Sequence, residues 1–238
     1  MDTIKINKDK TLMIAHRGLS KIERENTAAA FIAAGNRTYY GCECDVRKTL
    51  DNKYVIAHDA DLKRNAGRAL EIKDCIYEEL LKVNLYDVLG VARDYYKILL
   101  LEDYIRICKK YQKKCIIEFK LDYSVFEIKE IIKIINNEEY IENCMFISFL
   151  KNPLLITKGL LPNNKIQYLN DKIDKDTINF CVNNHFDIDV QHKALSKEVV
   201  EMFHAKKLEV NCWTVDDPER AKELIEMGVD YITTNILE

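Results

Sequence analysis

The segment that decides the fold is Gly41-Cys42-Glu43-Cys44-Asp45-Val46, in which acidic and apolar side chains alternate. Because successive side chains of a β-strand point to opposite faces, Glu43 and Asp45 share one face and the apolar side chains share the other. The segment 115–120 repeats the arrangement, with Glu118 and Lys120 on a common face. This pattern predicts strands that pack an apolar face against helices and direct charged side chains into the mouth of a barrel.

Short β-rich runs alternate with helical patterns along the rest of the chain. Strands are predicted over 12–15, 41–46, 115–120, 144–149, 165–169, 186–190, 208–214 and 230–233. Helices are predicted over 27–35, 101–111, 125–136, 153–159, 175–183, 197–206 and 217–227, with Ser196 beginning one and Gly228 ending another. This alternation predicts one α/β domain over residues 1–238, a TIM-like (β/α)8 barrel rather than an open doubly wound sheet.

Two segments after the second predicted strand depart from the repeat. Residues 48–58 predict a hairpin, because Asp51-Asn52 can supply left-handed turn residues before the Val55-Ile56-Ala57 run. Residues 59–96 then form a small insertion, partly helical and without a barrel strand of its own. Because long loops after barrel strands lie on the active-site face, we expect this insertion to cap the barrel mouth.

Composition excludes several classes of protein. The formal net charge of -3 gives no attraction to nucleic acid, and no apolar run reaches the roughly 20 residues that a membrane-spanning helix needs. The polar segment Met1 to Lys10 lacks the apolar core of a secretory signal, so we expect a cytoplasmic protein without stable membrane insertion. The eight cysteines form no CxxC pair, which favours buried free thiols over disulfides or zinc ligands.

Three carboxylates, those of Glu43, Asp45 and Glu118, are predicted to converge on one place. They cannot all remain ionised in a narrow cavity without a counter-charge, and a hard divalent cation would supply it. The alternative is a set of salt bridges with the basic residues Arg17, Arg47 and Lys120. The presence of two acidic strands favours the cation.

Two histidines, His16 and His58, each end a predicted strand segment and stand beside a charged residue. A facing pair of imidazoles can divide general-base and general-acid work across a breaking bond. Arg17 offers a planar fork suited to phosphate, and Lys120 a point charge. Trp213 is predicted to project into the mouth, the alternative being a tryptophan of the core.

These segments resemble, in order, the motifs of the glycerophosphodiester phosphodiesterase family. The matching residues are His16-Arg17-Gly18, Glu25-Asn26-Thr27, Glu43-x-Asp45-Val46, Thr49-x-Asp51, Val55-x-x-His58-Asp59-x-x-Leu62-x-Arg64, Ile117-Glu118-x-Lys120, Trp213-Thr214-Val215 and the segment Gly228 to Asn235. The resemblance implies hydrolysis of small-molecule glycerophosphodiesters to glycerol 3-phosphate and an alcohol, with one bound Ca²⁺ or Mg²⁺. It assigns the metal to Glu43, Asp45 and Glu118, acid/base catalysis to His16 and His58, phosphate contacts to Arg17 and Lys120, and the pocket border to Trp213.

Two other functions remain open at this point. A phospholipase D-like barrel acting on lysophospholipid or sphingolipid headgroups would share the two histidines and the metal carboxylates. A non-catalytic barrel that binds a phosphorylated ligand would be favoured by the loss of one of these five residues, and all five are present.

Overall fold

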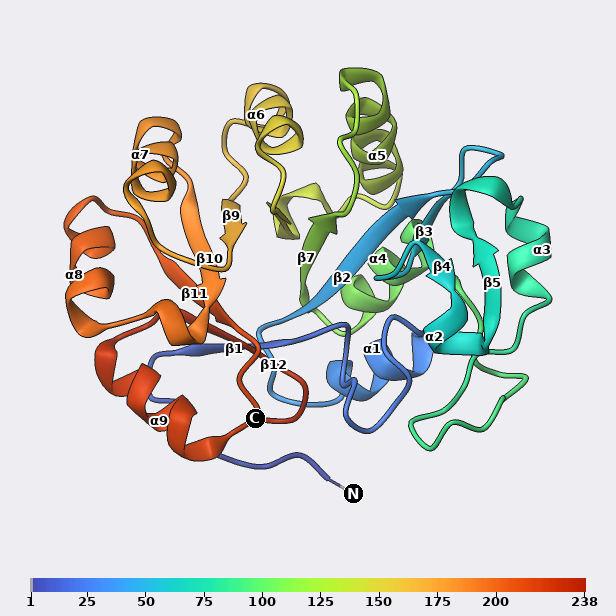
Figure 1. The fold of residues 1–238 in the computed structure, drawn as a ribbon, viewed down its shortest axis with the longest axis horizontal. Helices are drawn as coiled ribbons and strands as arrows, with labels where there is room; N and C mark the ends of the chain where they lie inside the picture. The colour runs from blue at the N-terminus through green and yellow to red at the C-terminus, as the bar shows by residue number, and fades with distance from the viewer. Residues whose placement is uncertain (1) are drawn as a thin grey trace.

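The computed structural model describes residues 2–238, so Met1, the first residue of the predicted domain, lies outside the described residues. Eight parallel strands form a closed barrel in the order β1-β12-β11-β10-β9-β8-β7-β2, and β1 pairs with β2 to complete it (Figure 1). The barrel strands are β1 (Leu12–Ala15), β2 (Gly41–Lys48), β7 (Lys114–Phe119), β8 (Cys144–Ser148), β9 (Ile166–Asn170), β10 (Asp187–Gln191), β11 (Val210–Trp213) and β12 (Tyr231–Thr234). All eight predicted strands are therefore confirmed, as is the TIM-like (β/α)8 fold.

Helices follow the barrel strands and cover their outer surface (Figure 1). They are α1 (Ala28–Gly35), α4 (Leu101–Lys110), α5 (Val125–Asn137), α6 (Lys151–Leu160), α7 (Lys175–Asn184), α8 (Lys197–Ala205) and α9 (Pro218–Met227), with the 3-10 turns η2 (Ile141–Asn143) and η3 (His192–Ala194) between them. Gly228 ends α9 in the left-handed conformation, as predicted. Ser196 precedes α8 as predicted, but its side chain makes no capping hydrogen bond to the helix.

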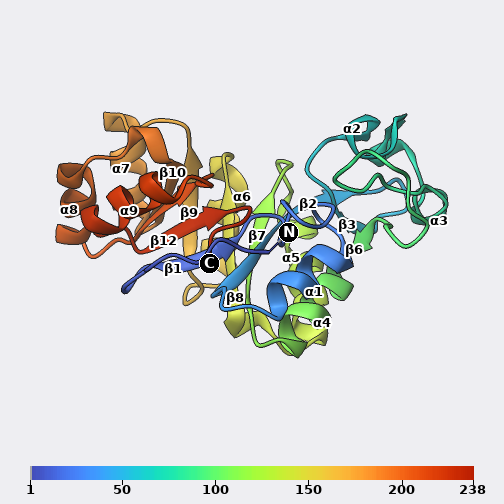
Figure 2. The same cartoon turned by 90° about the horizontal axis from the view of Figure 1, so that it is seen from below.

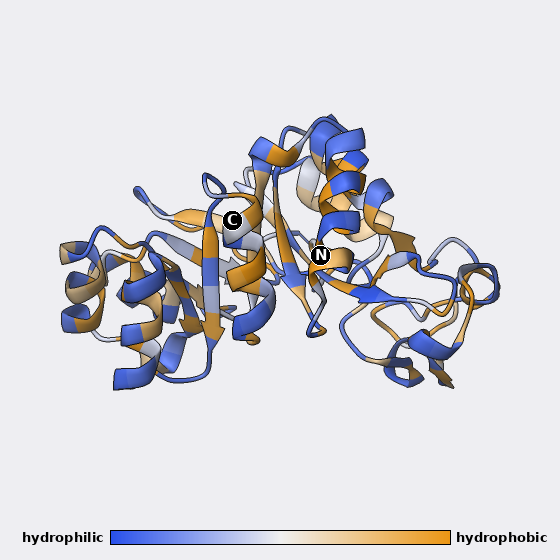
Figure 3. Cartoon of the chain, turned by 90° about the horizontal axis from the view of Figure 1, so that it is seen from above, coloured by the Kyte–Doolittle hydropathy of each residue, from blue (hydrophilic) through white to orange (hydrophobic). Residues whose placement is uncertain are grey.

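The hydrophobic core has two layers, one outside the strands and one inside. The outer layer joins strands to helices, and Figure 3 shows apolar strands surrounded by helices of mixed polarity. The inner layer is smaller and comprises the buried side chains of Ile14, Ile116, Met145, Ile147, Leu169 and Tyr231. All eight cysteines are buried and free, which confirms the prediction of core thiols. Since apolar residues fill the lower interior, charged side chains are left to the mouth.

The predicted hairpin is present after β2. Strand β3 (Tyr54–Ile56) runs antiparallel to β2, with Val46 opposite Ile56. Only Asn52 takes a positive φ, of 61°, whereas Asp51, predicted to share that role, instead accepts a hydrogen bond from the Thr49 hydroxyl. The return strand thereby runs back along β2, where Ala57 bonds to the Asp45 main chain, and brings His58 to the level of Asp45.

The insertion packs as a small unit of its own on the β2 and β3 side of the barrel. It contains β4 (Asp61–Leu62), α2 (Lys63–Ala66), β5 (Arg68–Glu71), η1 (Ile72–Asp74) and α3 (Tyr77–Leu81), and β6 (Leu99–Leu100), which follows it, pairs with β3. A separate cluster of buried residues, including Leu62, Ile72 and Leu80, holds it together. Figure 2 shows it on the far side of the barrel strands from α7 and α8.

A glycine directly after the first strand is needed for close packing. Gly18 has a φ of +77°, and a Cβ there would lie 2.6 Å from the main-chain carbon of Ala30 in α1. Gly18→Ala should therefore lower the free energy of unfolding by about 2 to 4 kcal/mol, measured by urea denaturation, since strain and overpacking add.

Gly159, in the last turn of α6, provides the matched control. A Cβ at Gly159 meets no atom within 4 Å, so Gly159→Ala should raise the free energy of unfolding by about 0.5 to 1 kcal/mol. Equal effects of the two substitutions would contradict the packing explanation.

Among residues 2–238, no helix combines the length and the apolar character required to cross a membrane.

Candidate active site

Three buried carboxylates lie together at the carboxyl end of the barrel. Glu43 and Asp45 come from β2 and Glu118 from β7, and strand register places Asp45 beside Glu118. One ligand oxygen from each of the three lies within 4.8 Å of the others. The alternation predicted from the sequence therefore does bring the three acids to one point.

The three acids have different pKa values, because burial, mutual repulsion and nearby basic residues act on them to different degrees. Burial, followed by the charges of Asp45 and Glu118, raises the pKa of Glu43 well above its ordinary value. Burial, with the Asp45 charge, also raises the pKa of Glu118 to about 7. Burial acts in the same direction on Asp45, but Arg17 and Lys120 outweigh it and hold its pKa below the ordinary value. The cluster thus lacks enough positive charge to keep all three acids ionised.

Two basic residues, Arg17 and Lys120, supply the positive charge that is present. The Arg17 guanidinium lies 3.3 Å from Asp45, and its main-chain N–H donates to Glu43 at 2.9 Å. Lys120 donates to Glu118 at 2.8 Å and lies 3.4 Å from Asp45. Salt bridges with Arg17, Arg47 and Lys120 were the alternative to a cation. Those of Arg17 and Lys120 are present.

Arg47, the third basic residue of that alternative, does not join the cluster. Its guanidinium donates to the main-chain oxygen of His58, at 2.9 Å from Nε. By alternation Arg47 shares the face of Glu43 and Asp45, but it lies two residues beyond Asp45, where it holds the hairpin return strand. The alternative set of salt bridges is therefore wrong for Arg47.

Both histidines are anchored through Nδ1, and each has a partner that the sequence did not reveal. His16 Nδ1 lies 2.8 Å from Oδ1 of Asn235, and Nδ2 of Asn235 donates to Asp216 at 2.7 Å. His58 Nδ1 lies 2.7 Å from Asp59 Oδ1. This leaves Nε2 of each ring for other partners, and that of His16 lies 4.0 Å from Glu43.

Burial lowers the pKa of both imidazoles. For His16 the pKa falls to about 4, because burial and the Arg17 charge outweigh the hydrogen bond to Asn235. For His58 burial is again the largest cause, opposed by the charge of Asp45. Both rings are therefore neutral at pH 7 in the protein alone, which is the state that a general base requires.

A cavity of about 180 Å³ joins these groups at the mouth. Its lining residues are His16, Arg17, Glu43, His58, Glu118, Lys120, Ile147, Phe149, Leu169, Asp189, Trp213 and Thr233. Trp213 borders this cavity, where its ring lies edge-on to Phe149 at 5.7 Å between centroids. Asp45 lies just beneath the cavity and is fully buried.

The insertion reaches the site through Arg64 rather than through the cavity lining. Arg64 donates to both oxygens of Glu25, at 2.9 and 2.6 Å, and Glu25 also pairs with Arg17 at 3.3 Å. Arg64 further donates to Asp59, the partner of His58. Among the described residues, the cavity lining includes none from 59–96. A cap over the mouth therefore stays a prediction, and Arg64 ties the insertion to the site.

Several residues of the site were not predicted from the sequence as functional. Asn26 donates to Asp45 at 2.8 Å, and Asn235 and Asp216 hold His16. Asn26 and Asn235 lie within the family motifs, a signal that could have found them. Asp189 is a different case, because only the alternation within β10 points to an inward carboxyl.

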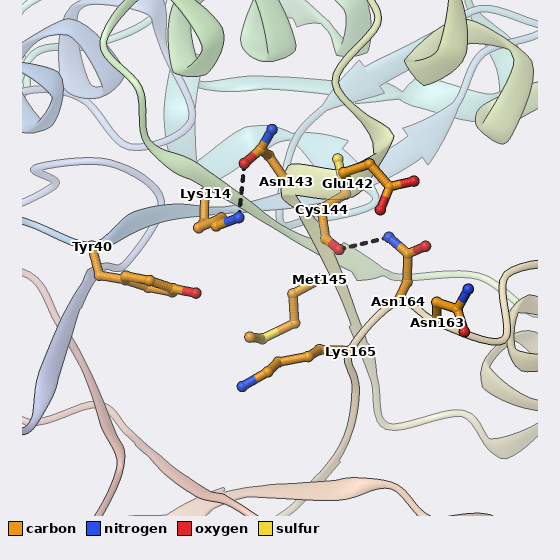
Figure 4. Close-up of a pocket in the computed structure, with 9 residues that line it drawn as sticks. All are labelled: Tyr40, Lys114, Glu142, Asn143, Cys144, Met145, Asn163, Asn164 and Lys165. Carbon is orange, nitrogen blue, oxygen red and sulfur yellow. Dashed lines mark hydrogen bonds between the residues drawn. The ribbon is translucent and has the colours of Figure 1, made fainter.

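A second cavity, of about 130 Å³, lies at the opposite end of the barrel (Figure 4). It is lined where strands begin, by residues such as Lys114 of β7 and Cys144 of β8. Lys114 donates to Asn143 at 2.7 Å, and Asn164 donates to the main-chain oxygen of Cys144 at 3.0 Å. Its polar groups thus bond to one another, as at the structural face of this fold.

The fold and the mouth together define a (β/α)8-barrel protein in which three clustered carboxylates are flanked by basic residues and two histidines. Residues 16–238 match the model of the Glycerophosphoryl diester phosphodiesterase family. The chain belongs to this family, as the sequence motifs had indicated.

Individual relatives are similar to this chain over almost its full length. A glycerophosphodiester phosphodiesterase of Bacillus altitudinis is 27% identical, covering 94% of each chain, and one of Caldanaerobacter subterraneus is 29% identical, covering 95% of this chain and 94% of the relative. The crystal structure of a glycerophosphodiester phosphodiesterase from Parabacteroides distasonis superposes with a TM-score of 0.79 at 27% identity, over 96% of this chain and 94% of that one. An Oleispira antarctica phosphodiesterase in complex with sn-glycerol-3-phosphate shares the fold, with a TM-score of 0.83 at 22% identity over 98% and 96% of the two chains.

Proposed function

We propose that this protein hydrolyses glycerophosphodiesters to glycerol 3-phosphate and an alcohol, using His16 and His58 as the acid/base pair. The observation that carries the proposal is one cavity lined by both histidines, by Arg17 and Lys120, and by two members of the acidic cluster. Membership of the family supports the reaction class.

The acidic cluster fits a divalent cation. Glu43 Oε1 and Asp45 Oδ1 are buried and have no hydrogen-bond partner among the described residues. Three clustered carboxylates, two of which have an oxygen without a hydrogen bond, are a donor set suited to Ca²⁺ or Mg²⁺. Glu43, Asp45 and Glu118 would hold the cation, which when bound supplies a Lewis acid for a phosphate oxygen.

The remaining steps use groups of the chain itself. Arg17 and Lys120 bind the non-bridging oxygens and offset the charge of the diester, which leaves phosphorus open to attack. One histidine, in its neutral form, removes a proton from the nucleophile, either water or the glycerol 2-hydroxyl. The other takes up a proton in the complex, because the negative charge of the diester favours the imidazolium form, and it then protonates the departing alkoxide. The Nδ1 anchors, Asn235 and Asp59, hold each ring with Nε2 free for this work.

The test is a panel of glycerophosphodiesters incubated with the purified protein, with and without chelator. Release of glycerol 3-phosphate that stops on chelation supports the proposal. A product that is instead a cyclic phosphate, formed from lysophospholipids but not from the water-soluble diesters, would support the phospholipase D-like alternative. Ligand binding without turnover would support a non-catalytic barrel.

The insertion provides a prediction about the choice of alcohol. We expect that exchanging residues 59–96 for the corresponding segment of the Bacillus altitudinis relative will change the relative kcat/KM for two headgroups by about tenfold, because loops near the mouth shape the alcohol side of a pocket. Kinetics with glycerophosphocholine and glycerophosphoethanolamine measure the change.

The control exchanges residues 161–165, a loop before β9 at the other end of the barrel, and should leave selectivity unaltered. Unchanged selectivity in both chimaeras would show that the insertion has no part in the choice of alcohol.

A further inference from the structure

One carboxyl group in the cavity has no part in the acidic cluster and no partner. Asp189, in β10, has 2% of its surface exposed, and its Oδ1 is buried without a hydrogen bond among the described residues. Its neighbours do bond to one another: Asn211 donates to Gln167 at 3.0 Å, and Thr233 donates to Asn211 at 3.3 Å. A buried unpartnered acid is destabilising, so its presence calls for a ligand.

The cavity has a closed floor and an open rim. Ile147, Leu169, Asp189 and Thr233 are each less than 5% exposed and form the floor, whereas Phe149, at the rim, is 39% exposed. Trp213 lies between them, with its indole N–H 3.4 Å from the main-chain oxygen of Asp189. The cationic and acidic residues of β1, β2 and β7 occupy the other side of the cavity.

A diester bound with its phosphate at Arg17 and Lys120 must place one of its two alcohol portions toward this floor. The glycerol portion is the same in every substrate of the proposed reaction, and the other alcohol varies in size. A closed floor of fixed shape suits the constant portion, and an open rim suits the variable one, which must also leave.

We propose that Asp189 recognises the hydroxyl groups of the substrate's glycerol portion and is the specificity-determining residue for glycerol at this site. The proposal rests on the proposed function. A protonated carboxyl group can both accept hydrogen bonds from a diol and donate one to it, and Thr233 lines the same floor. The Trp213 ring offers an apolar surface for the carbon chain of the glycerol.

The experiment compares two diesters with the same leaving group, glyceryl 4-nitrophenyl phosphate and propyl 4-nitrophenyl phosphate. The second lacks both hydroxyls but is otherwise matched, and nitrophenolate release reports both reactions when water is the nucleophile. When the glycerol 2-hydroxyl is the nucleophile, the propyl diester is not cleaved and the calorimetric comparison below carries the test. Asp189→Leu should lower kcat/KM for the glyceryl diester by about 10²-fold and for the propyl diester by less than threefold, because a site built to bond a hydroxyl discriminates strongly against its absence.

Asp189→Asn is the conservative variant. It keeps an acceptor and a donor, so kcat/KM for the glyceryl diester should stay within about tenfold of the wild-type value. Both variants should unfold at a temperature no lower than the wild type, since each removes a buried unpartnered carboxyl. Binding of glycerol 3-phosphate and of propyl phosphate, measured by calorimetry, gives an arm independent of turnover, and only the former should weaken in Asp189→Leu.

Three results would overturn the inference. Equal losses on both diesters would show a structural role for Asp189. A change in the preference between glycerophosphocholine and glycerophosphoethanolamine, with the glyceryl-to-propyl ratio unaltered, would place Asp189 on the leaving-alcohol side. Lower melting temperatures in both variants would show that the carboxyl has a partner in the fold. A wild type that cleaves no glycerophosphodiester contradicts the proposed function itself, and this inference falls with it.

Discussion

Replacing Glu43, Asp45 or Glu118 by its amide is expected to lower turnover of a glycerophosphodiester by about 10³-fold or more. Each substitution removes one carboxylate from a cluster suited to a divalent cation, whose contribution to stabilising phosphoryl charge amounts to several kcal/mol. Calorimetric titration with Ca²⁺ and Mg²⁺ measures the accompanying loss of affinity.

Without metal, the substitution of Glu43 should instead raise the stability of the fold. Burial and repulsion from its two neighbours raise the pKa of Glu43, so the acid is unfavourable in the fold. Glu43→Gln should therefore unfold at a higher temperature than the wild type in chelator. Reduced activity together with increased stability distinguishes a binding site from a structural network.

Asp187→Asn is the matched control for this series. Asp187 also lies on a barrel strand, but at the amino end of β10, where its carboxylate accepts a hydrogen bond from the Glu209 main chain. It should leave turnover and metal affinity unchanged. Full activity of the three amide variants in the presence of chelator would exclude a metal role for the cluster.

Replacing His16 or His58 by alanine should lower turnover by about 10² to 10⁴, the usual range for losing a positioned proton-transfer group. The two variants should then differ on glyceryl 4-nitrophenyl phosphate, whose leaving group needs no proton. This substrate should restore the rate of the variant that lacks the general acid and not that of the variant that lacks the base.

His204→Ala is the control, because His204 also bonds to a carboxylate, 2.8 Å from Asp230, but on α8 at the other end of the barrel. It should keep wild-type rates on both substrates. If nitrophenolate release is restored in both variants, or in neither, the two histidines do not divide the roles of acid and base.

The barrel could be predicted because strand periodicity and helix periodicity are local properties of the chain. Glu43, Asp45 and Glu118 could be placed together for the same reason: alternation sets the face, and parallel strands end at one edge. The family motifs added the order of the segments. These parts of the site therefore follow from short stretches of sequence.

The remaining parts depend on contacts between distant segments. His16 is held by Asn235, which lies 219 positions later in the chain, and no local pattern joins the two. Arg17 pairs with a carboxylate of the cluster, whereas Arg47 donates to the main-chain oxygen of His58. The sequence alone does not show which of these two partners an arginine will take. Asp189 has the alternation of an inward residue, but only the surrounding bonds show that it is left without a partner.

The pairing of β1 with β2, which closes the barrel, affects how the protein loses activity on heating. Two residue pairs join these strands, whereas six join β2 to β7. His16 and Arg17 directly follow β1, and the Arg17 main-chain N–H donates to Glu43 on the neighbouring strand β2. Opening of the β1–β2 pairing alone would separate Arg17 from the three carboxylates while the other strand pairs stay intact. We therefore expect inactivation to precede global unfolding on heating, so that a sample can keep a folded spectrum after it has lost activity.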